Sequence, residues 1–299
     1  MTEATVEFAS ETLKNETLAL DATERFYAAL NRMFAGDLGP MSEIWTKDAD
    51  VVLMGPYGGR QIGKTDVQRM FEKDASLKHA GQIMPRDLLV RVGDKLAYSV
   101  CIERGEITTS TEARIPVDVR GTNILKRQGE DWRVVYHHTD QLPQMQEASN
   151  LKIEEFPAAP VQAPDPDVIK ALDQLFAAVN SMFTGDLEPL YDVWANTDDV
   201  TFASPVGNIQ VGWSAVRAEF ERHSKTGIQG SLQYKDLLTR VSGDLAYASC
   251  LSYAPDLTIG GKPYAFNQRQ TVIFRREGDA WLVVHLHLDQ GEGLADLCK

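Results

Sequence analysis

The chain has 299 residues, of which 43% are hydrophobic and 24% are charged, and its formal net charge is −13. This composition suits a globular protein with a sizeable core, and the length suggests two domains. The sequence pI is about 4.9 and no run of Lys or Arg is present, which argues against nucleic acid as a partner. No apolar stretch is long enough to span a bilayer, so we expect no membrane partner either.

Residues 1–19 carry several Glu residues among Thr and Ala, and they lack the basic start and apolar block of a signal peptide. The three cysteines, Cys101, Cys250 and Cys298, form no close pair in the sequence. An odd number without a pairing pattern argues against a disulfide framework and favours a reducing compartment. We therefore expect a cytoplasmic protein in which Cys101 and Cys250 are small buried residues on strands.

An internal repeat organises the chain. Residues 31–141 and 180–290 are gap-free copies of each other at a constant offset of 149. This period is much longer than that of solenoid repeats, so each copy should be a domain with its own core. A stretch rich in Pro and Ala separates the copies and indicates an exposed linker. The expected boundaries are an N-terminal extension at 1–19, a first domain at 20–142, a linker at 143–166, a second domain at 167–293 and a tail at 294–299.

The predicted elements follow the same order in both copies. Each opens with an amphipathic helix; in the second copy, Leu172, Leu175 and Phe176 fall on one helical face. Helices grouped before a meander of strands indicate an α+β domain. The order in the first copy is a helix at 26–34, a short helix near 40–45, a strand at 50–54, a helix from 65 and four strands divided by loops at 93–94, 105–113 and 129–130.

Several marks carry a family resemblance: Trp45 and Trp194 after the opening helices, a Gly-led third helix, and strands starting at Arg120 and Arg269 that precede Trp132 or Trp281 and a His-bearing end. This pattern resembles the SnoaL-like branch of the nuclear-transport-factor-2-like (NTF2-like) superfamily. The resemblance implies two cone domains, each with three helices packed in a curved, mostly antiparallel sheet around a pocket. The superfamily includes isomerases, cyclases, dehydratases, hydrolases and non-catalytic oligomerisation modules, so the resemblance does not fix an activity.

Strand alternation divides the side chains of the last strand into two faces. One face carries Trp132, Val134, Tyr136, His138 and Asp140 in the first copy, and Trp281, Val283, His285, His287 and Asp289 in the second. We predict that this face lines the cone and that the opposite, wholly apolar face of the second copy is covered by another sheet. The resemblance implies pairing through the outer faces of the sheets, so the copies could form an intramolecular pseudo-dimer, with a homodimer also open.

The candidate acid–base groups are His138, Asp140 and Glu103 in the first copy, and His287, His285 and Asp289 in the second. Imidazole titrates near neutrality, and a carboxylate in the resembled pockets often acts as a base. The candidate substrate-binding residues are Trp45, Tyr98 and Arg120, with Trp194, Tyr247 and Arg269. The structural alternatives are histidines held by hydrogen bonds at the strand ends, arginines paired with Asp140 and Asp289, and tryptophans in the core.

His285, His287 and Asp289 could invite a metal ion, but the first copy has Tyr136 in place of His285 and a further ligand would have to come from elsewhere. Nucleophile motifs, Gly-rich phosphate loops and clustered Cys ligands are absent from the sequence, so we predict no metal and no cofactor. Asp74 corresponds to His223, and Glu103 to Ser252. The two pockets should therefore differ in chemistry.

Three functional hypotheses follow. The first is a pocket protein for a small hydrophobic or polar organic molecule, acting as a cofactor-independent cyclase, isomerase or dehydratase through one poised acid–base group. The second is a non-catalytic binding or assembly module, with the fused pair as a scaffold. In the third, one copy catalyses while the other supports it.

Overall fold

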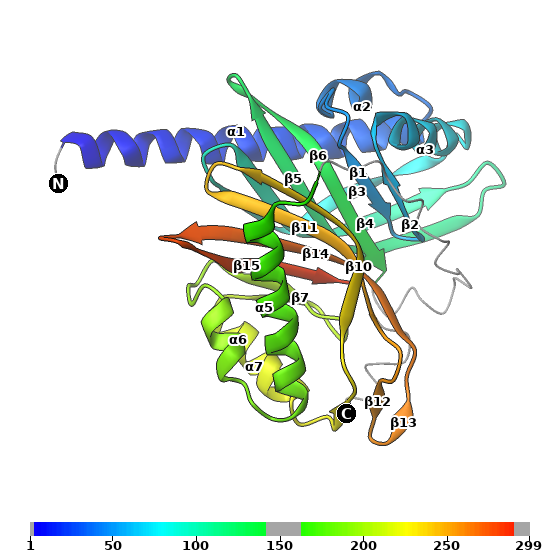
Figure 1. The fold of residues 1–299 in the computed structure, drawn as a ribbon. Helices are drawn as coiled ribbons and strands as arrows, with labels where there is room; N and C mark the ends of the chain where they lie inside the picture. The colour runs from blue at the N-terminus through cyan, green and yellow to red at the C-terminus, as the bar shows by residue number, and fades with distance from the viewer. Residues whose placement is uncertain (1–2, 142–162, 290–299) are drawn as a thin grey trace. The chain divides into compact units, whose positions relative to one another are not determined.

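The computed structural model describes residues 3–141 and 163–289, which belong to two compact units (Figure 1). Residues 3–141 lie in the first unit and residues 163–289 in the second. Cys298, most of the expected linker and the expected tail lie outside the described residues. Within the described part of the chain, no helix is both long and apolar enough to cross a membrane.

The first unit is an α+β domain with one six-stranded sheet, in the order β2-β1-β6-β5-β4-β3. Neighbouring strands are antiparallel except for β1 and β6, so the prediction of a mostly antiparallel sheet is confirmed. Its elements are α1 (Glu3–Phe34), α2 (Gly39–Ile44), β1 (Val52–Gly55), β2 (Gly58–Ile62), α3 (Lys64–Ser76), β3 (Ala80–Val92), β4 (Leu96–Thr108), β5 (Arg114–Gln128) and β6 (Asp131–Gln141).

The second unit repeats this order in its six-stranded sheet, β10-β11-β14-β15-β7-β8, and adds a small sheet, β13-β12-β9. Its helices are α5 (Pro166–Phe183), α6 (Glu188–Val193) and α7 (Trp213–His223). Its strands are β7 (Thr201–Ala203), β8 (Ile209–Val211), β9 (Ile228–Gln229), β10 (Gln233–Ser242), β11 (Leu245–Ala254), β12 (Thr258–Ile259), β13 (Lys262–Pro263), β14 (Phe266–Glu277) and β15 (Ala280–Leu288).

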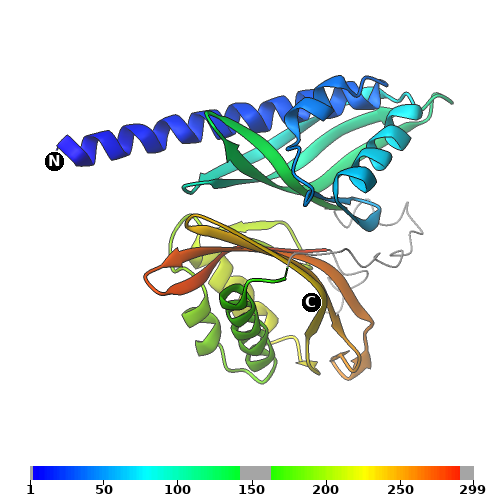
Figure 2. The same cartoon turned by 45° about the horizontal axis from the view of Figure 1, so that its top comes forward.

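The opening helix of the first unit is longer than predicted. No Gly or Pro occurs between Glu3 and Phe34, so nothing in the sequence interrupts the helix, and most of the expected extension is the first half of α1. The helix ends before Gly36, which has φ +97° and donates its N–H to the carbonyl of Met33. Helix α1 packs against β3 and β6, and Figure 2 shows the helices of each unit on one face of its curved sheet.

The two copies differ at one end of the sheet. Strand β4 continues through Gly105 to Thr108, so the loop expected at 105–113 is shorter than predicted. The equivalent strand β11 stops at Ala254, before Pro255, which has no N–H for a strand ladder. The chain then folds into β12 and β13, which form the small sheet with β9.

A β-bulge interrupts the last strand of the first unit. Leu125 on β5 faces Val134 on β6, while the preceding Ile124 faces Tyr136, so Val135 is an extra residue on β6. An extra residue breaks the alternation of side chains along a strand. Side chains after Val135 therefore exchange faces relative to those before it.

The same bulge occurs at the equivalent place in the second unit. Phe274 on β14 faces Val283 on β15, and Ile273 faces His285, so Val284 is the extra residue. As in the first unit, the histidine-bearing end of the strand is rotated relative to the tryptophan-bearing end.

The bulge overturns the predicted faces of the last strand. Trp132 and Val134 do lie in the core beside the helices, but His138 and Asp140 point to the opposite face of the sheet. His137 takes the helix side instead, with its ring 5.0 Å from that of Phe26 on α1.

The prediction is also wrong for the second unit. Leu286 and Leu288, placed on an outer face from the sequence, line the interior. His285, His287 and Asp289 alternate with these leucines and so lie on the far face.

Each far face carries a buried ion pair. The Arg120 guanidinium donates from Nε and Nη2 to Asp140 Oδ1 and Oδ2, at 2.9 and 2.6 Å. Arg269 donates to Asp289 in the same bidentate way, at 2.8 and 3.0 Å. The structural alternative for both arginines is thereby confirmed. Each pair joins the last two long strands of its sheet.

Substitution of one partner tests the importance of this pair. Asp140→Ala leaves the Arg120 guanidinium buried without its carboxylate, so we expect a loss of about 3–5 kcal/mol in the free energy of unfolding. Asp118→Ala, which removes the partner of the exposed Arg104, should cost at most about 1 kcal/mol. Urea denaturation of both variants measures the difference, and equal losses would contradict the assignment.

Candidate functional site

The interior of the first unit holds a buried polar cluster around Glu103. The Tyr27 hydroxyl on α1 donates to Glu103 Oε1 at 3.0 Å and lies 3.0 Å from Cys101 Sγ. Asn123 on β5 donates from Nδ2 to the Tyr27 hydroxyl and to Ser99 Oγ, both at 3.1 Å. The helix and two strands are therefore joined through one set of hydrogen bonds.

His137 completes this set on β6. Its Nδ1 lies 2.7 Å from Asn123 Oδ1, and its Nε2 lies 3.8 Å from Glu103 Oε1. Glu103 is 3% exposed and His137 is 6% exposed, so both are enclosed by protein. We call Tyr27, Ser99, Cys101, Glu103, Asn123 and His137 the Glu103 cluster.

The environment of Glu103 favours its protonated form. Burial raises its pKa to about 8, although the hydrogen bond from Tyr27 acts in the opposite direction. Burial also raises the pKa of the Cys101 thiol, so this cysteine is not a reactive thiolate. A Cβ at Gly121 would lie 2.7 Å from Glu103 Oε1, so the absence of a side chain there makes room for the carboxyl group.

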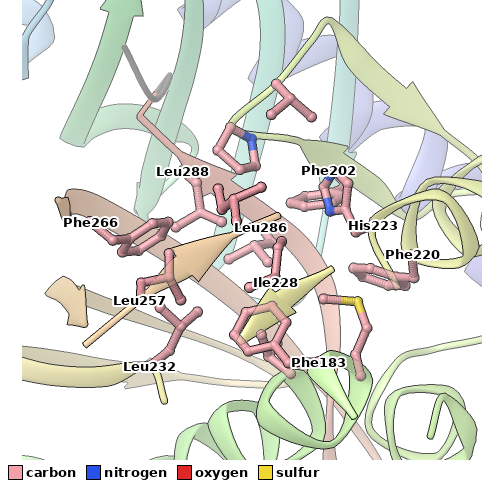
Figure 3. A pocket seen from close by; sticks show the side chains of 15 residues that line it. Phe183, Phe202, Phe220, His223, Ile228, Leu232, Leu257, Phe266, Leu286 and Leu288 are labelled. Atoms are coloured by element: carbon pink, nitrogen blue, oxygen red, sulfur yellow. The ribbon is translucent and has the colours of Figure 1, made fainter. Parts of the chain in front are cut away.

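The interior of the second unit contains a partly enclosed apolar cavity of about 60 Å³ (Figure 3). Aromatic and aliphatic side chains from the main sheet, the helices and the small sheet form its wall, together with one histidine, His223. The lining residues are Val179, Met182, Phe183, Phe202, Pro205, Val206, Phe220, His223, Ile228, Leu232, Leu257, Ile259, Phe266, Leu286 and Leu288.

A second polar group borders this cavity, on helix α7 and just after β7. His223 Nε2 lies 3.1 Å from Glu219 Oε1, one helical turn away. Ser204 Oγ donates to the same oxygen at 2.7 Å, and Arg222 donates to both oxygens of Glu219, at 2.6 and 3.1 Å. Arg222 Nη2 also lies 3.0 Å from His223 Nε2.

These contacts fix the charge of Glu219. Burial alone would raise its pKa, but the hydrogen bonds from His223, Arg222 and Ser204 lower it well below the usual range. Glu219 is therefore ionised at neutral pH and orients the Nε2 side of the imidazole. A histidine held in this way can exchange a proton at its other ring nitrogen.

The polar residues of each interior are replaced as a group in the other copy. At the offset of 149, the polar residues Tyr27, Ser99, Glu103, Asn123 and His137 correspond to Phe176, Ala248, Ser252, Val272 and Leu286. In the other direction, Ser204, Glu219 and His223 correspond to Gly55, Met70 and Asp74. The first interior thus holds a polar cluster, whereas the lining of the second unit's cavity is apolar except for His223 at its edge.

The residues predicted as acid–base groups do not come together. Only Glu103 lies on the helix side; His138 and Asp140 are on the other face of the same sheet, as are His285, His287 and Asp289 in the second unit. His285 instead pairs with Thr201, with Nδ1 2.7 Å from the Thr201 hydroxyl.

The predicted substrate-binding residues are structural in their contacts. Trp45 donates from Nε1 to Met41 Sδ in the first core, and the Trp194 ring packs against Phe220 behind the cavity wall. Tyr98 and Tyr247, like Arg120 and Arg269, lie on the far face. The core alternative for the tryptophans is therefore the better description, and Cys101 and Cys250 are buried residues on strands β4 and β11, as expected.

Tyr27, Asn123, His137, Ser204 and Glu219 were not predicted as site residues. Two signals in the sequence could have found some of them. Phe176 was placed on the inward helix face, so its equivalent Tyr27 had to be inward as well. Glu219 and His223 are four residues apart on a predicted helix and flank the inward Phe220. Among residues 3–141 and 163–289, no group of three or more His, Cys, Asp or Glu side chains could hold a metal ion.

Comparison with known families gives two matches to one family model. The model of the SnoaL-like domain matches residues 20–141 and 168–289, which correspond to the two units. A comparison with curated proteins gives no match.

Three solved structures similar to the chain each cover less than half of it. A Streptomyces avermitilis protein of the NTF2-like family, named as a candidate dehydratase, is 20% identical with a TM-score of 0.39 and covers 43% of this chain and 97% of its own. A candidate calcium/calmodulin-dependent protein kinase type II association domain from Thiobacillus denitrificans is 27% identical (TM-score 0.36; 44% and 98% covered). An NTF2-like protein from Pseudomonas putida is 24% identical (TM-score 0.35; 41% and 82% covered). At this level of similarity the three structures give no information on activity.

The Glu103 cluster should make stability depend on pH. Because the folded state keeps a proton on Glu103 that the unfolded state loses above its ordinary pKa, stability should fall as pH rises from about 4.5 to about 8. The slope from this group is at most about 1.4 kcal/mol per pH unit. Glu103→Gln should remove that part of the slope, as measured by urea denaturation at several pH values.

The control for this experiment is Glu106→Gln, an exposed glutamate on the same strand. It should keep the slope of the unaltered protein. If Glu103→Gln and Glu106→Gln both gave the slope of the unaltered protein, Glu103 would not be protonated in the folded state.

Proposed function

The chain belongs to the SnoaL-like domain family, and on this premise we propose that its second unit binds a small, mainly apolar organic molecule and exchanges a proton with it through His223. The observation that carries the proposal is the apolar cavity with a single histidine in its wall, backed by an ionised glutamate. Apolar walls with few polar groups are typical of small-molecule sites.

The proposed acid–base role depends on the two ring nitrogens of His223 having different surroundings. Glu219 and Ser204 lie at Nε2, and no hydrogen bond engages Nδ1 in the described part of the chain. With a proton on Nε2 donated to Glu219, Nδ1 carries a lone pair that can accept a proton from a bound molecule. The reaction class is proton transfer without a cofactor, as in an isomerase or a lyase.

The first unit has a supporting role in this proposal. The groups of the Glu103 cluster hydrogen-bond to one another, and such a closed network joins the helix to the sheet. This corresponds to the hypothesis that one copy catalyses while the other supports it. Pairing of the two domains with each other, and of two chains, stays a prediction.

One observation favours non-catalytic binding as the second candidate function. The Arg222 guanidinium lies 3.0 Å from His223 Nε2, and because guanidinium groups only donate hydrogen bonds, this contact favours Nε2 as an acceptor. His223 would then be a hydrogen-bonding group for the ligand rather than an acid–base catalyst.

Filling the cavity tests binding. Leu257→Trp places a larger side chain in the wall, so binding of cyclohexanone, measured by ligand-observed NMR, should weaken at least about tenfold. The control is Thr108→Trp at the equivalent position of the first unit, which should leave binding unchanged. Equal binding by the two variants would show that the probe does not occupy this cavity.

Hydrogen–deuterium exchange tests the acid–base role. In D₂O, His223 should accelerate exchange of the protons next to the cyclohexanone carbonyl, and His223→Ala should lower this rate at least about 100-fold. Asp74→Ala, at the equivalent position of the first unit, should have no effect. If His223→Ala retained full exchange while the probe still bound, the second candidate function would be the correct one.

A further inference from the structure

Four buried side chains in the second unit have polar atoms without a hydrogen-bond partner among the described residues. Two are indole Nε1 groups, of Trp194 and Trp281; the other two, Ser252 through its Oγ and Gln268 through both Nε2 and Oε1, are neighbours in the sheet. Ser252 is fully buried and Gln268 is 3% exposed. A buried polar group without a partner costs about 1–3 kcal/mol, and most such groups in proteins are paired. Two neighbouring exceptions therefore point to a partner outside the chain.

The two side chains lie together on the face of the sheet that borders the cavity, although neither is among the cavity's lining residues. Ser252 on β11 is directly opposite Gln268 on β14, so they project from the same face of the sheet. Phe266, two residues before Gln268 on that face, lines the cavity. Gln270, two residues after it, is opposite Leu288, which also lines the cavity. The pair thus neighbours the lining residues Phe266 and Leu288 on the same face of the sheet.

Comparison with the first unit explains why these groups have no partner. Ser252 occupies the position of Glu103, whose carboxyl group is held by Tyr27 and lies near His137. The equivalents of these two residues are Phe176 and Leu286, which offer no hydrogen bond. The second unit therefore has polar groups at this place in the sheet, Ser252 at the position of Glu103 and Gln268 at that of Val119, without the side chains that satisfy Glu103 in the first unit.

We propose that Ser252 and Gln268 form the polar end of the second unit's cavity and bind the oxygen of a neutral ligand, such as a ketone or an alcohol. The Ser252 hydroxyl and the Gln268 amide both donate hydrogen bonds, and the amide oxygen also accepts one. No Lys or Arg is among the residues that line the cavity, which favours an uncharged oxygen over a carboxylate.

This subsite deepens the proposed function and rests on it, because the remainder of the ligand lies among the phenylalanine and leucine side chains of the same cavity. It also assigns the two ends of the ligand. The oxygen lies at the sheet, and a carbon near His223 exchanges the proton.

The test compares cyclohexanone with methylenecyclohexane, which has the same ring but a CH₂ group in place of the oxygen. The unaltered protein should bind cyclohexanone at least about tenfold more tightly, since a site built to hydrogen-bond discriminates against a ligand lacking the group. In Ser252→Ala and Gln268→Leu this ratio should fall to near one, through weaker binding of cyclohexanone alone. Binding is measured by ligand-observed NMR on the full chain.

The matched control is Ser249→Ala, which removes a buried serine from the opposite face of the same strand and should keep the ratio. The Gln268 side-chain NH₂ resonances should also shift when cyclohexanone is added, and not when methylenecyclohexane is added. This readout does not depend on the stability of any variant.

Three outcomes would overturn the subsite, and they are distinguishable. If both probes bind the unaltered protein equally well, the cavity stands and the subsite does not. If Gln268→Leu and Ser252→Ala keep the tenfold ratio, these side chains do not bind the ligand oxygen. If neither probe binds, the proposed function fails together with the subsite.

Discussion

One extra residue in the last strand of each sheet determines the chemistry of the whole domain. Val135 and Val284 are the bulged residues, and they reverse the faces of everything that follows. The reversal sends Asp140 and Asp289 to the far side of the sheet, where they pair with Arg120 and Arg269. These arginines lie on that side through the uninterrupted alternation of β5 and β14. The reversal also brings His137 in the first unit and Leu286 in the second toward the helices. Without the bulge, Asp140 and Asp289 would point into the interiors, away from the arginines with which they pair.

The fold could be predicted from the sequence, whereas most of the site could not, and one physical cause explains both. The repeat at an offset of 149, the helical spacing of apolar residues and strand alternation each depend on many residues together. They therefore predict the α+β domains and the order of their elements correctly. A bulge is a single insertion in a Val-Val step, and no Gly or Pro marks it. Alternation carried across that step therefore assigned His138 and His287 to the wrong face. Trp132 and Val134, before the bulge, were assigned correctly.

Buried polar groups satisfy each other's hydrogen bonds, which explains why the polar residues of the first interior are replaced together in the second. Removing Tyr27 or Asn123 alone would leave Glu103 and His137 with fewer partners in a low-dielectric interior, at a cost larger than that of the lost contact. Replacement of the whole group by Phe176, Val272 and Leu286 avoids that cost, and an apolar cavity results. Ser252 and Gln268 are informative against this background because neither has a hydrogen-bond partner among the described residues.

The break in β11 at Pro255 has a consequence for how the second cavity could acquire new ligands. Part of the cavity wall is formed by β9 and β12, each only two residues long, and by the residue before β12; these contribute Ile228, Leu257 and Ile259. The rest of the wall includes side chains of the six-stranded sheet. Short strands with few neighbours open at lower free energy than the central sheet. Substitutions there change the shape and the entrance of the cavity without disturbing the strands that hold the domain together. The second copy thus separates the part of the protein that can vary with a ligand from the part that must be kept for folding, and the first copy, with its continuous β4, does not.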